Sequence, residues 1–432
     1  IRAAALGLKP LLLEKMTMPA GNTIYAAGFL LGLNTSFQKA KGTANDTNEA
    51  FFNDMMKVSQ QKAVPVLTHK VVDNCTRLLE WLHPYCGAKL VWPMLTRAHL
   101  VTGEVKPGGG QLAMTLLNKA KSLGVEVRTK TQVVELLSDP KKGNVNGVRV
   151  KTKDGLSEVY SKFGVVLATG GYSANQQLVT QYIGSAGAKM PIRGSRIIAG
   201  ENVVLTAPFL PKVVNVDQYH CGPIYGPTGA NPLNIVNNGI CVNKEGKRFT
   251  DEGQTYVQMS RDVAAKTPDN WAFMVCDQTT HDIPILKNDW ESYSRTKAPV
   301  YTGNTIEEAA KAAGLDPKVL AKTVEDYNDA VKSGETSKLS PVNTLPKAPL
   351  IEKAPFYIVP FQGGMTATFG GPKIGKNGEV LNGENQPVPG LFACGNAIGG
   401  LFYYDYIVGS QLTAAVIWGR LSAKEAVKAL KA

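Results

Sequence analysis

Apolar positions recur along the chain at two spacings, which predicts a mixed α/β protein. Apolar residues spaced as on one helical face predict helices at about 1–7, 44–62, 68–83, 111–122 and 411–430. Short apolar or alternating runs predict strands at 10–13, 125–128 and 163–168 and a hairpin from 131–137 and 145–152. The run at 163–168 is continuously apolar, which is typical of a parallel strand buried on both faces.

The middle of the chain differs in composition from both ends. From about 212 to 350 it is more polar and rich in aromatics and turns, with a Lys- and acid-rich helical stretch at 305–334. The Pro- and Lys-rich segment 341–355 is typical of a return linker. Because 432 residues exceed one ordinary core, we expect the first and last thirds to form one α/β domain, with a second domain inserted between them.

Charge narrows the choice of partner. The 47 Lys and Arg against 35 Asp and Glu give a net charge of +12, spread along the chain rather than clustered. Nucleic-acid binding needs a basic stripe on one face, so we do not expect it. A solvated basic surface that attracts an anionic substrate or an acidic partner fits better.

The sequence sets few limits on the compartment. It has no run of about 18 apolar residues, so no transmembrane segment is expected. Ile1 opens the chain without an initiator Met or a signal-peptide pattern, so the start looks cut. We therefore expect a soluble protein, cytoplasmic or periplasmic. The six cysteines form no C-x-x-C pair, which removes the spacing for c-type haem, an iron–sulfur cluster or a zinc ribbon, and no metal site is expected.

Several small-residue segments suit a bound dinucleotide. Such a site needs a Gly-rich turn after its first strand and a carboxylate ending the second. The chain begins inside the helix that would follow that turn, so the glycine fingerprint is missing, but Glu14 ends the strand 11–13. By itself, an acid at the end of a strand is more often simply solvated. Ala26-Ala27-Gly28 and Thr169-Gly170-Gly171 add segments in which a backbone can lie against a flat cofactor.

Five segments together resemble the flavoprotein family of fumarate reductases and succinate dehydrogenases. That family has soluble relatives such as urocanate reductase, tricarballylate dehydrogenase and ketosteroid dehydrogenases. The segments are Glu14 to Gly28, Arg97 to Gly103, Ala168 to Gly171, Val242 to Phe249 and Gly395 to Gly419. The resemblance implies a discontinuous, Rossmann-like FAD-binding domain at 1–211 and 351–432, with an inserted α+β capping domain at 212–350 that closes over the substrate.

The resemblance also implies which residues contact FAD. Glu14 would bind the adenosine ribose, Val133 would lie on the adenine side, and the helix beginning at Gln411 would point its N-terminus at the flavin. Asn396 and Glu201 stand where relatives often have Glu and Asp. The expected contacts are Glu14, Lys15, Asn22, Ala27, Gly28, Arg97, Val133, Ala168, Thr169, Gly170, Glu201, Gly370, Gly395, Asn396, Gln411 and Leu412. For Arg97, with His99, a structural pair is an equal alternative.

The substrate-binding pattern of fumarate reductases is broken in this chain. Their proton-donating arginine falls near Ile235, their second substrate arginine on Tyr406, and their paired histidines on Thr366 and Ala367. A dicarboxylate without these partners would bury unpaired charge, so we exclude fumarate and succinate.

Aromatic residues take the place of the missing cations. A tyrosine hydroxyl is neutral at pH 7 and is a competent general acid, so Tyr406 or Tyr404 is the expected proton donor. The alternative is that these rings only shape the pocket. The expected substrate-binding residues are Tyr403, Phe402, Tyr219, His220 and Arg193. Arg193 could hold a carboxylate, and a surface salt bridge is an equal alternative for it.

The expected activity is FAD-dependent reduction of an activated C=C bond in an acrylate- or enone-type substrate. Flavin N5 would give the hydride and a tyrosine the proton, while a separate cytochrome or flavoprotein would supply electrons. Two alternatives stay open. One is a dehydrogenase that introduces a C=C bond into a ketosteroid or tricarballylate-like compound, and the other is a flavin electron-transfer subunit without its own substrate.

Overall fold

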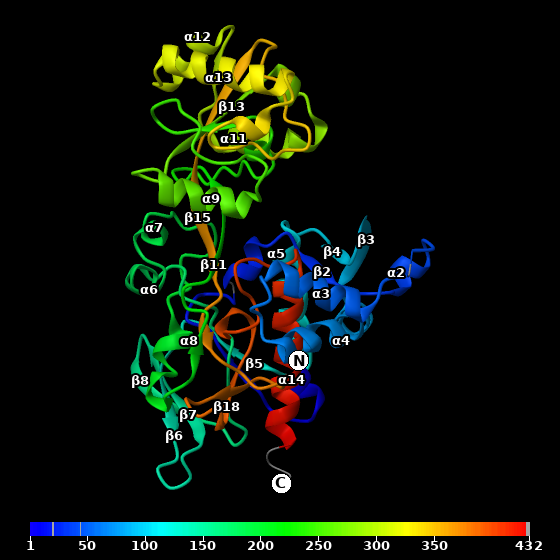
Figure 1. Cartoon of the computed structure of the whole chain (residues 1–432). Helices are drawn as coiled ribbons and strands as arrows, with labels where there is room; N and C mark the ends of the chain where they lie inside the picture. Colours follow the sequence, from blue (N-terminus) through cyan, green and yellow to red (C-terminus); the bar gives the residue numbers. More distant parts are fainter. Residues whose placement is uncertain (20, 44, 429–432) are drawn as a thin grey trace. The chain divides into compact units, whose positions relative to one another are not determined.

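The computed structural model describes residues 1–19, 21–43 and 45–428, and they form a mixed α/β protein (Figure 1). The chain divides into two compact units. The first unit comprises 1–178, 194–219 and 367–432, and the second comprises 179–193 and 220–366. The expected domain limits were 211 and 350, whereas the second unit runs on to 366 and also takes in 179–193. The composition of residues 179–193 did not indicate that they belong to the second unit.

Two parallel strand pairs organise the first unit. Strand β1 (Leu11–Leu13) pairs with β5 (Glu126–Arg128), and β9 (Val165–Leu167) pairs with β18 (Pro387–Ala393). Strand β18 also pairs antiparallel with β17 (Glu379–Leu381). The parallel strand expected at 163–168 is present, but its burial on both faces is wrong, because Val166 is 40% exposed.

Antiparallel strands complete the sheets of the first unit. The expected hairpin is β6 (Gln132–Ser138) with β7 (Val145–Thr152), to which β8 (Gly155–Tyr160) adds a third strand that the sequence did not predict. The remaining strands are β2 (Phe29–Leu31), β3 (Lys89–Leu95), β4 (Ala98–Thr102), β10 (Val213–Val214) and β16 (Gly371–Pro372).

The helices of the first unit bury apolar faces in one core. Thr47 caps α3 (Asn48–Val58) by accepting from the Ala50 N–H at 3.0 Å, and α14 (Ser410–Lys428) packs against α4 (Pro65–Leu82) (Figure 1). Fully buried side chains such as Trp418 and Leu78 fill this core. The shorter helices of the chain are α1 (Arg2–Ala5), α2 (Ser36–Lys39), α6 (Gln176–Tyr182), α7 (Ser185–Ala188), α8 (Glu201–Val204) and α10 (Gln278–His281).

Helix α5 (Gly108–Ser122) begins three residues before the expected start at Gln111. Glycines usually disfavour a helix. Here the backbone needs them, since a Cβ on Gly109 would lie 2.0 Å from the Thr23 carbonyl oxygen and one on Gly108 would lie 2.5 Å from that of Ala27. Packing therefore overrides propensity at this helix start.

A five-stranded sheet forms the centre of the second unit. Its order is β11 (Tyr219–Ile224), β15 (Phe356–Thr368), β13 (Ala272–Asp277) and β12 (Ile240–Val242), with β14 (Tyr301–Gly303) paired to β15. The long helices of this unit are α9 (Tyr256–Lys266), α11 (Lys287–Thr296), α12 (Ile306–Ala313) and α13 (Pro317–Lys332). The expected helical stretch 305–334 is thus two helices, broken where Gly314 takes φ +73° and Asp316 caps α13.

All six cysteines are buried with free thiols. Across the described ranges, the structure holds no helix that is long and apolar enough to cross a membrane.

Candidate active site

The end of β1 is joined to a distant segment of the first unit. Glu14 follows the strand directly, and one of its carboxylate oxygens accepts from the Met16 N–H at 2.8 Å. The next residue, Lys15, forms an ion pair with Glu201 at the start of α8. The second oxygen of Glu201 is buried without a hydrogen-bond partner.

The carboxyl ends of β9 and β18 lie at the same edge because the two strands are parallel neighbours. The Cys394 N–H donates to the Leu167 carbonyl at 2.9 Å, which places Gly395 and Asn396 beside Ala168 and Thr169. The Gly200 N–H donates to the Gly171 carbonyl at 3.0 Å and brings Glu201 to this region. The structure therefore gathers seven predicted residues here: Lys15, Ala168, Thr169, Gly170, Glu201, Gly395 and Asn396.

Asn22 and Gly28 are held by protein contacts. The Asn22 side-chain oxygen accepts from the Ser195 N–H at 2.8 Å. Gly28 has φ +95°, and a Cβ on it would lie 2.5 Å from the Gly108 carbonyl carbon. The small size of Gly28 is thus required by the start of α5, whether or not Ala27 and Gly28 also contact a cofactor.

The first turn of α14 carries unsatisfied polar groups. Ser410 Oγ and Gln411 Nε2 are buried without a partner, and the neighbouring Leu412 packs against the core. The N-terminus of this 19-residue helix has the partial positive charge of the helix dipole. A group that accumulates negative charge is stabilised at such an end.

These observations test whether the first unit fits FAD. Buried polar atoms are nearly always paired, so each orphan needs an explanation. Orphans in these regions include Glu201 Oε2, Asn202 Oδ1, Ser410 Oγ, Gln411 Nε2 and Ser173 Oγ, the last near the Thr169–Gly171 turn. Ribose and ribityl hydroxyls and the polar edge of a flavin supply the missing partners, so these residues fit FAD.

Other predicted contacts are already satisfied by the protein. The Arg97 guanidinium binds Asp46 and Asp54 and lies over the Phe51 ring. Burial lowers the pKa of Arg97, but the hydrogen bonds to both carboxylates outweigh it and raise the pKa above its usual value. His99 bonds to Thr35 and to the Arg97 carbonyl, and burial lowers its pKa. These are the contacts of a structural pair, and the FAD role of Arg97 stays a prediction.

Two more of the predicted cofactor residues pack inside the first unit. Val133 lies on β6 against the core. Gly370 is enclosed, because a Cβ on it would lie 2.5 Å from the Val216 Cα, and its carbonyl accepts from Asn202 at 3.1 Å. Their contact with FAD also stays a prediction.

The aromatic segment Phe402–Tyr406 has an unusual backbone. The Asp405 N–H donates to the Tyr403 carbonyl at 2.7 Å, which closes a three-residue turn with Tyr404 at its centre. Tyr404 has φ +63°, a region that costs a non-glycine residue about 1–3 kcal/mol. The Gln218 side-chain oxygen accepts from the Tyr404 N–H at 3.1 Å and supports the turn. The sequence did not single out Gln218, because a lone Gln carries no motif.

The neighbouring rings have different surroundings. Tyr406 meets Phe369 edge-on at 6.0 Å and Phe402 at 5.8 Å between centroids. The Tyr403 hydroxyl accepts from Lys62 Nζ at 3.0 Å, and that ammonium lies 4.6 Å from the ring centroid. Tyr406 therefore sits in an apolar cluster, and Tyr403 beside a cation.

The remaining substrate candidates lie on or beside β11. Tyr219 begins the strand, and His220 is buried with its Nε2 3.4 Å from the Tyr256 hydroxyl. Arg193 packs over the same strand at Gly222. Ile235, where the resemblance placed the fumarate reductases' proton donor, is fully buried.

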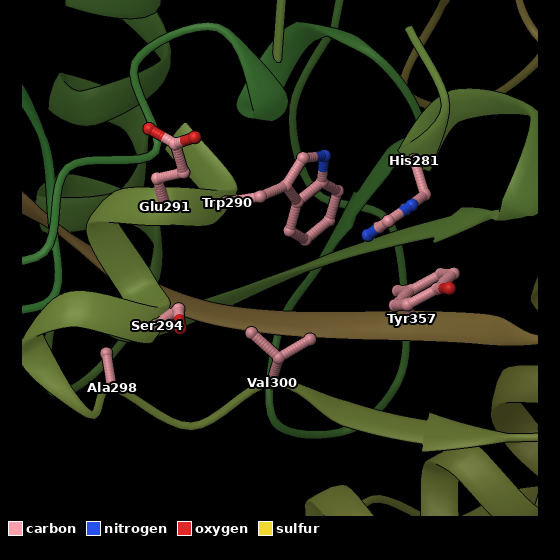
Figure 2. A pocket seen from close by; sticks show the side chains of 7 residues that line it. All are labelled: His281, Trp290, Glu291, Ser294, Ala298, Val300 and Tyr357. Atoms are coloured by element: carbon pink, nitrogen blue, oxygen red, sulfur yellow. The ribbon is translucent and has the colours of Figure 1, made fainter. Parts of the chain in front are cut away.

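A separate cleft opens on the second unit, with a volume of about 440 Å³. Figure 2 shows His281 and Tyr357 face to face, with Trp290 beside them; the first two ring centroids are 4.6 Å apart. The lining residues are His281, Trp290, Glu291, Ser294, Ala298, Val300 and Tyr357. None of these is a predicted site residue.

The strand ends, the unpaired buried atoms and the helix N-terminus suit a bound dinucleotide such as FAD. The model of the FAD binding domain family matches residues 1–406, and the chain belongs to that family. It is a flavin-dependent oxidoreductase with FAD as its cofactor.

Two relatives and one solved structure show how far the similarity extends. The probable fumarate reductase Ifc3 of Shewanella frigidimarina is 28% identical over 445 residues, covering 99% of this chain and 72% of that protein. The urocanate reductase of Eggerthella lenta is 26% identical over 441 residues, covering 99% and 72%. The open conformation of a flavocytochrome c3 fumarate reductase has a TM-score of 0.84 at 27% identity, covering 99% of this chain and 76% of that one.

Proposed function

We propose that the chain reduces an activated C=C bond of an acrylate- or enone-type substrate, with a tyrosine of the Phe402–Tyr406 segment as proton donor. The observation that carries this proposal is the strained turn at Tyr404. Strain of this kind persists only where the surroundings hold it, and it concentrates at functional sites.

The proposal assigns the proton transfer to a neutral phenol. Tyr404 is fixed through its backbone by Gln218, and Tyr406 is fixed by its ring contacts with Phe369 and Phe402. A hydroxyl held in place on a rigid backbone can donate to a carbon that becomes basic as the alkene is reduced. The Phe369 and Phe402 rings give the Tyr406 ring apolar neighbours.

FAD, held by the residues at the carboxyl ends of β9 and β18 and at the N-terminus of α14, supplies the hydride when bound. The chain's own part is to orient the alkene, to exclude water and to deliver the proton. The alkene carbon next to the one that takes the hydride receives the tyrosine proton, so the product is the saturated compound.

Fumarate is not the substrate in this proposal. Ile235, Tyr406 and Thr366 occupy the positions at which the resemblance puts cationic partners for two carboxylates. Relatives within the family carry different substrates in their names, fumarate for Ifc3 and urocanate for the Eggerthella protein, so family membership alone does not choose between them.

The electrons come, in this proposal, from a separate carrier protein, a cytochrome or a small flavoprotein. The basic net charge of +12 would attract an acidic carrier. The six buried cysteines offer no haem or cluster attachment of their own.

The test uses the FAD-loaded protein reduced anaerobically by a dye. Acrylates and enones should reoxidise the flavin faster than fumarate does. Tyr404→Phe and Tyr406→Phe separate the two hydroxyls, and the true donor's variant should lose about 100-fold or more in rate. Tyr160→Phe, on the exposed strand β8, is the matched control and should reoxidise at the wild-type rate.

Three results would contradict the proposal. A protein that reduces an oxidised dye with saturated substrates, but never reoxidises with alkenes, would be a dehydrogenase. A protein whose reduced flavin responds to no alkene at all would be an electron-transfer subunit. Wild-type rates in both tyrosine variants would remove the phenol from the mechanism.

A further inference from the structure

We propose that Arg193 binds the single carboxylate of the substrate, so that the enzyme acts on an α,β-unsaturated monocarboxylate. This inference rests on the proposed function and names its substrate class. It comes from the surroundings of one guanidinium in the second unit.

Arg193 has only neutral partners. Its Nη1 donates to the Thr366 hydroxyl at 3.1 Å and its Nη2 lies 3.4 Å from the Asn231 side-chain oxygen. Its Nε is buried and has no partner. Within the described ranges of the chain, no Asp or Glu forms an ion pair with it.

Two other arginines with buried side chains are neutralised by carboxylates. Arg97 pairs with Asp46 and Asp54, and Arg248 pairs with Glu252. A guanidinium stays charged at any physiological pH, and a partly buried charge without a counter-ion is costly. Arg193 therefore differs from Arg97 and Arg248 in a way that an anionic ligand explains.

The protein fixes this guanidinium before any ligand arrives. The Arg193 N–H donates to the Met365 carbonyl at 2.7 Å, which anchors its backbone along β15. A Cβ on Gly222 would lie 2.9 Å from the Arg193 Cζ, and one on Gly364 would lie 3.1 Å from the Arg193 Cβ. Two glycines on neighbouring strands thus form the slot in which the side chain lies.

The same sheet face carries further polar groups. Alternate residues of a strand point to the same face, so His220 shares a face with Gly222, and Thr366 shares one with Gly364. His220 is 2% exposed. Arg193, Thr366, Asn231 and His220 therefore make one polar set, which we call the Arg193 cluster.

The donor geometry suits one carboxylate. An arginine binds a carboxylate through two parallel N–H bonds, and Nε with a free Nη hydrogen provides such a fork. The Arg193 cluster contains one permanent cation, which can neutralise one carboxylate. A second carboxylate on the same substrate would have no cation to pair with. An unsaturated monocarboxylic acid meets this condition, whereas a dicarboxylate does not.

Matched pairs of acid and ester test the inference. The probes are acrylate with methyl acrylate and cinnamate with methyl cinnamate, each given to the dye-reduced holoenzyme. In Arg193→Gln, KM for the acids should rise about 30- to 100-fold with little change in kcat, while the KM values for the esters should stay within about twofold. Arg193→Lys should recover part of the loss, since it restores the charge but not the fork.

The control is Arg295→Gln, an exposed arginine of the same unit, which should change none of these constants. Equal losses for acid and ester, or no loss for the acids, would overturn the inference while leaving alkene reduction intact. Thermal unfolding of each variant checks that Arg193→Gln is folded.

A binding measurement separates this inference from the proposed function. Calorimetric titration of the oxidised holoenzyme with 3-phenylpropanoate needs no turnover. Arg193-dependent binding of this saturated acid would support the carboxylate subsite even if no alkene were reduced. Equal binding to wild type and Arg193→Gln would overturn the subsite.

Discussion

Lys15 and Glu201 form an ion pair although 186 positions separate them along the chain. Lys15 follows the end of β1 and Glu201 begins α8, so the pair joins two parts of the predicted cofactor region. Only one Glu201 oxygen is engaged, and the other is buried without a partner. Lys15 therefore engages one Glu201 oxygen and leaves the other without a partner in the protein.

Replacing Lys15 by Met should weaken FAD binding about tenfold, because Glu201 loses the cation that offsets its burial. Titration of the FAD-free protein, followed by quenching of flavin fluorescence, measures the change. Lys244→Met is the matched control, since Lys244 pairs with Asp269 at an exposed place in the second unit. Unchanged affinity in Lys15→Met would show that Glu201 does not contact the cofactor.

Arg97→Met should destabilise the first unit by about 1.5–3 kcal/mol, since it leaves Asp46 partly buried without a cation. Thermal unfolding with and without FAD separates two roles for this arginine. If Arg97 has only a structural role, its loss lowers the unfolding temperature equally with and without FAD. If it also contacts the cofactor, its loss lowers the unfolding temperature of the FAD-loaded protein more. Asp46→Asn removes the same ion pair by changing the carboxylate instead. If Asp46→Asn lowers the unfolding temperature less than Arg97→Met does, Arg97 has a role beyond this pair.

Periodicity predicted the elements whose signal is local. The spacing of apolar residues located α4 and α14, and the apolar run ending at Glu14 located β1. The start of α5 was missed because its three glycines disfavour a helix locally, and only the approach of the Thr23 and Ala27 carbonyls shows why they are there.

The sequence predicted which residues belong to the candidate site, but not which partners their side chains contact. Resemblance named Glu201 and Gln411, and the structure adds that each carries an unpaired buried atom. The resemblance did not reveal that Asp46 and Asp54 form ion pairs with Arg97, or that Arg193 has no carboxylate partner. Those differences depend on residues far apart in the sequence, which no spacing rule connects.

His99 should make the first unit less stable in mild acid. It is fully buried, its Nδ1 donates to the Arg97 carbonyl at 3.0 Å, and its Nε2 lies 2.8 Å from the Thr35 hydroxyl. Burial lowers its pKa below the value in the unfolded chain, about 6.5. The unfolded state then binds more protons, so stability is lost as the pH falls below about 6.5, by at most about 1.4 kcal/mol per pH unit.

Denaturant unfolding between pH 8 and pH 5 measures this slope. His99→Gln should be less stable at pH 8 but should lose less stability than wild type on acidification. His69→Gln, at an exposed position of α4, serves as the control and should keep the wild-type slope. A wild-type slope in His99→Gln would assign the acid sensitivity to other groups.

The strained turn predicts a reversal of the usual glycine penalty at Tyr404. At φ +63° a Cβ crowds the backbone, and glycine avoids this cost of about 1–2 kcal/mol. Tyr404→Gly should therefore be more stable than Tyr404→Ala by roughly 1 kcal/mol, although both lose the phenol. Tyr406 provides the comparison because its φ is not positive. Tyr406→Gly should be less stable than Tyr406→Ala by about 0.5–1 kcal/mol. Thermal unfolding of the four holoproteins gives both differences. If Tyr404→Gly were no more stable than Tyr404→Ala, the turn would carry no strain, and the structural argument for a functional tyrosine at this position would fail with it.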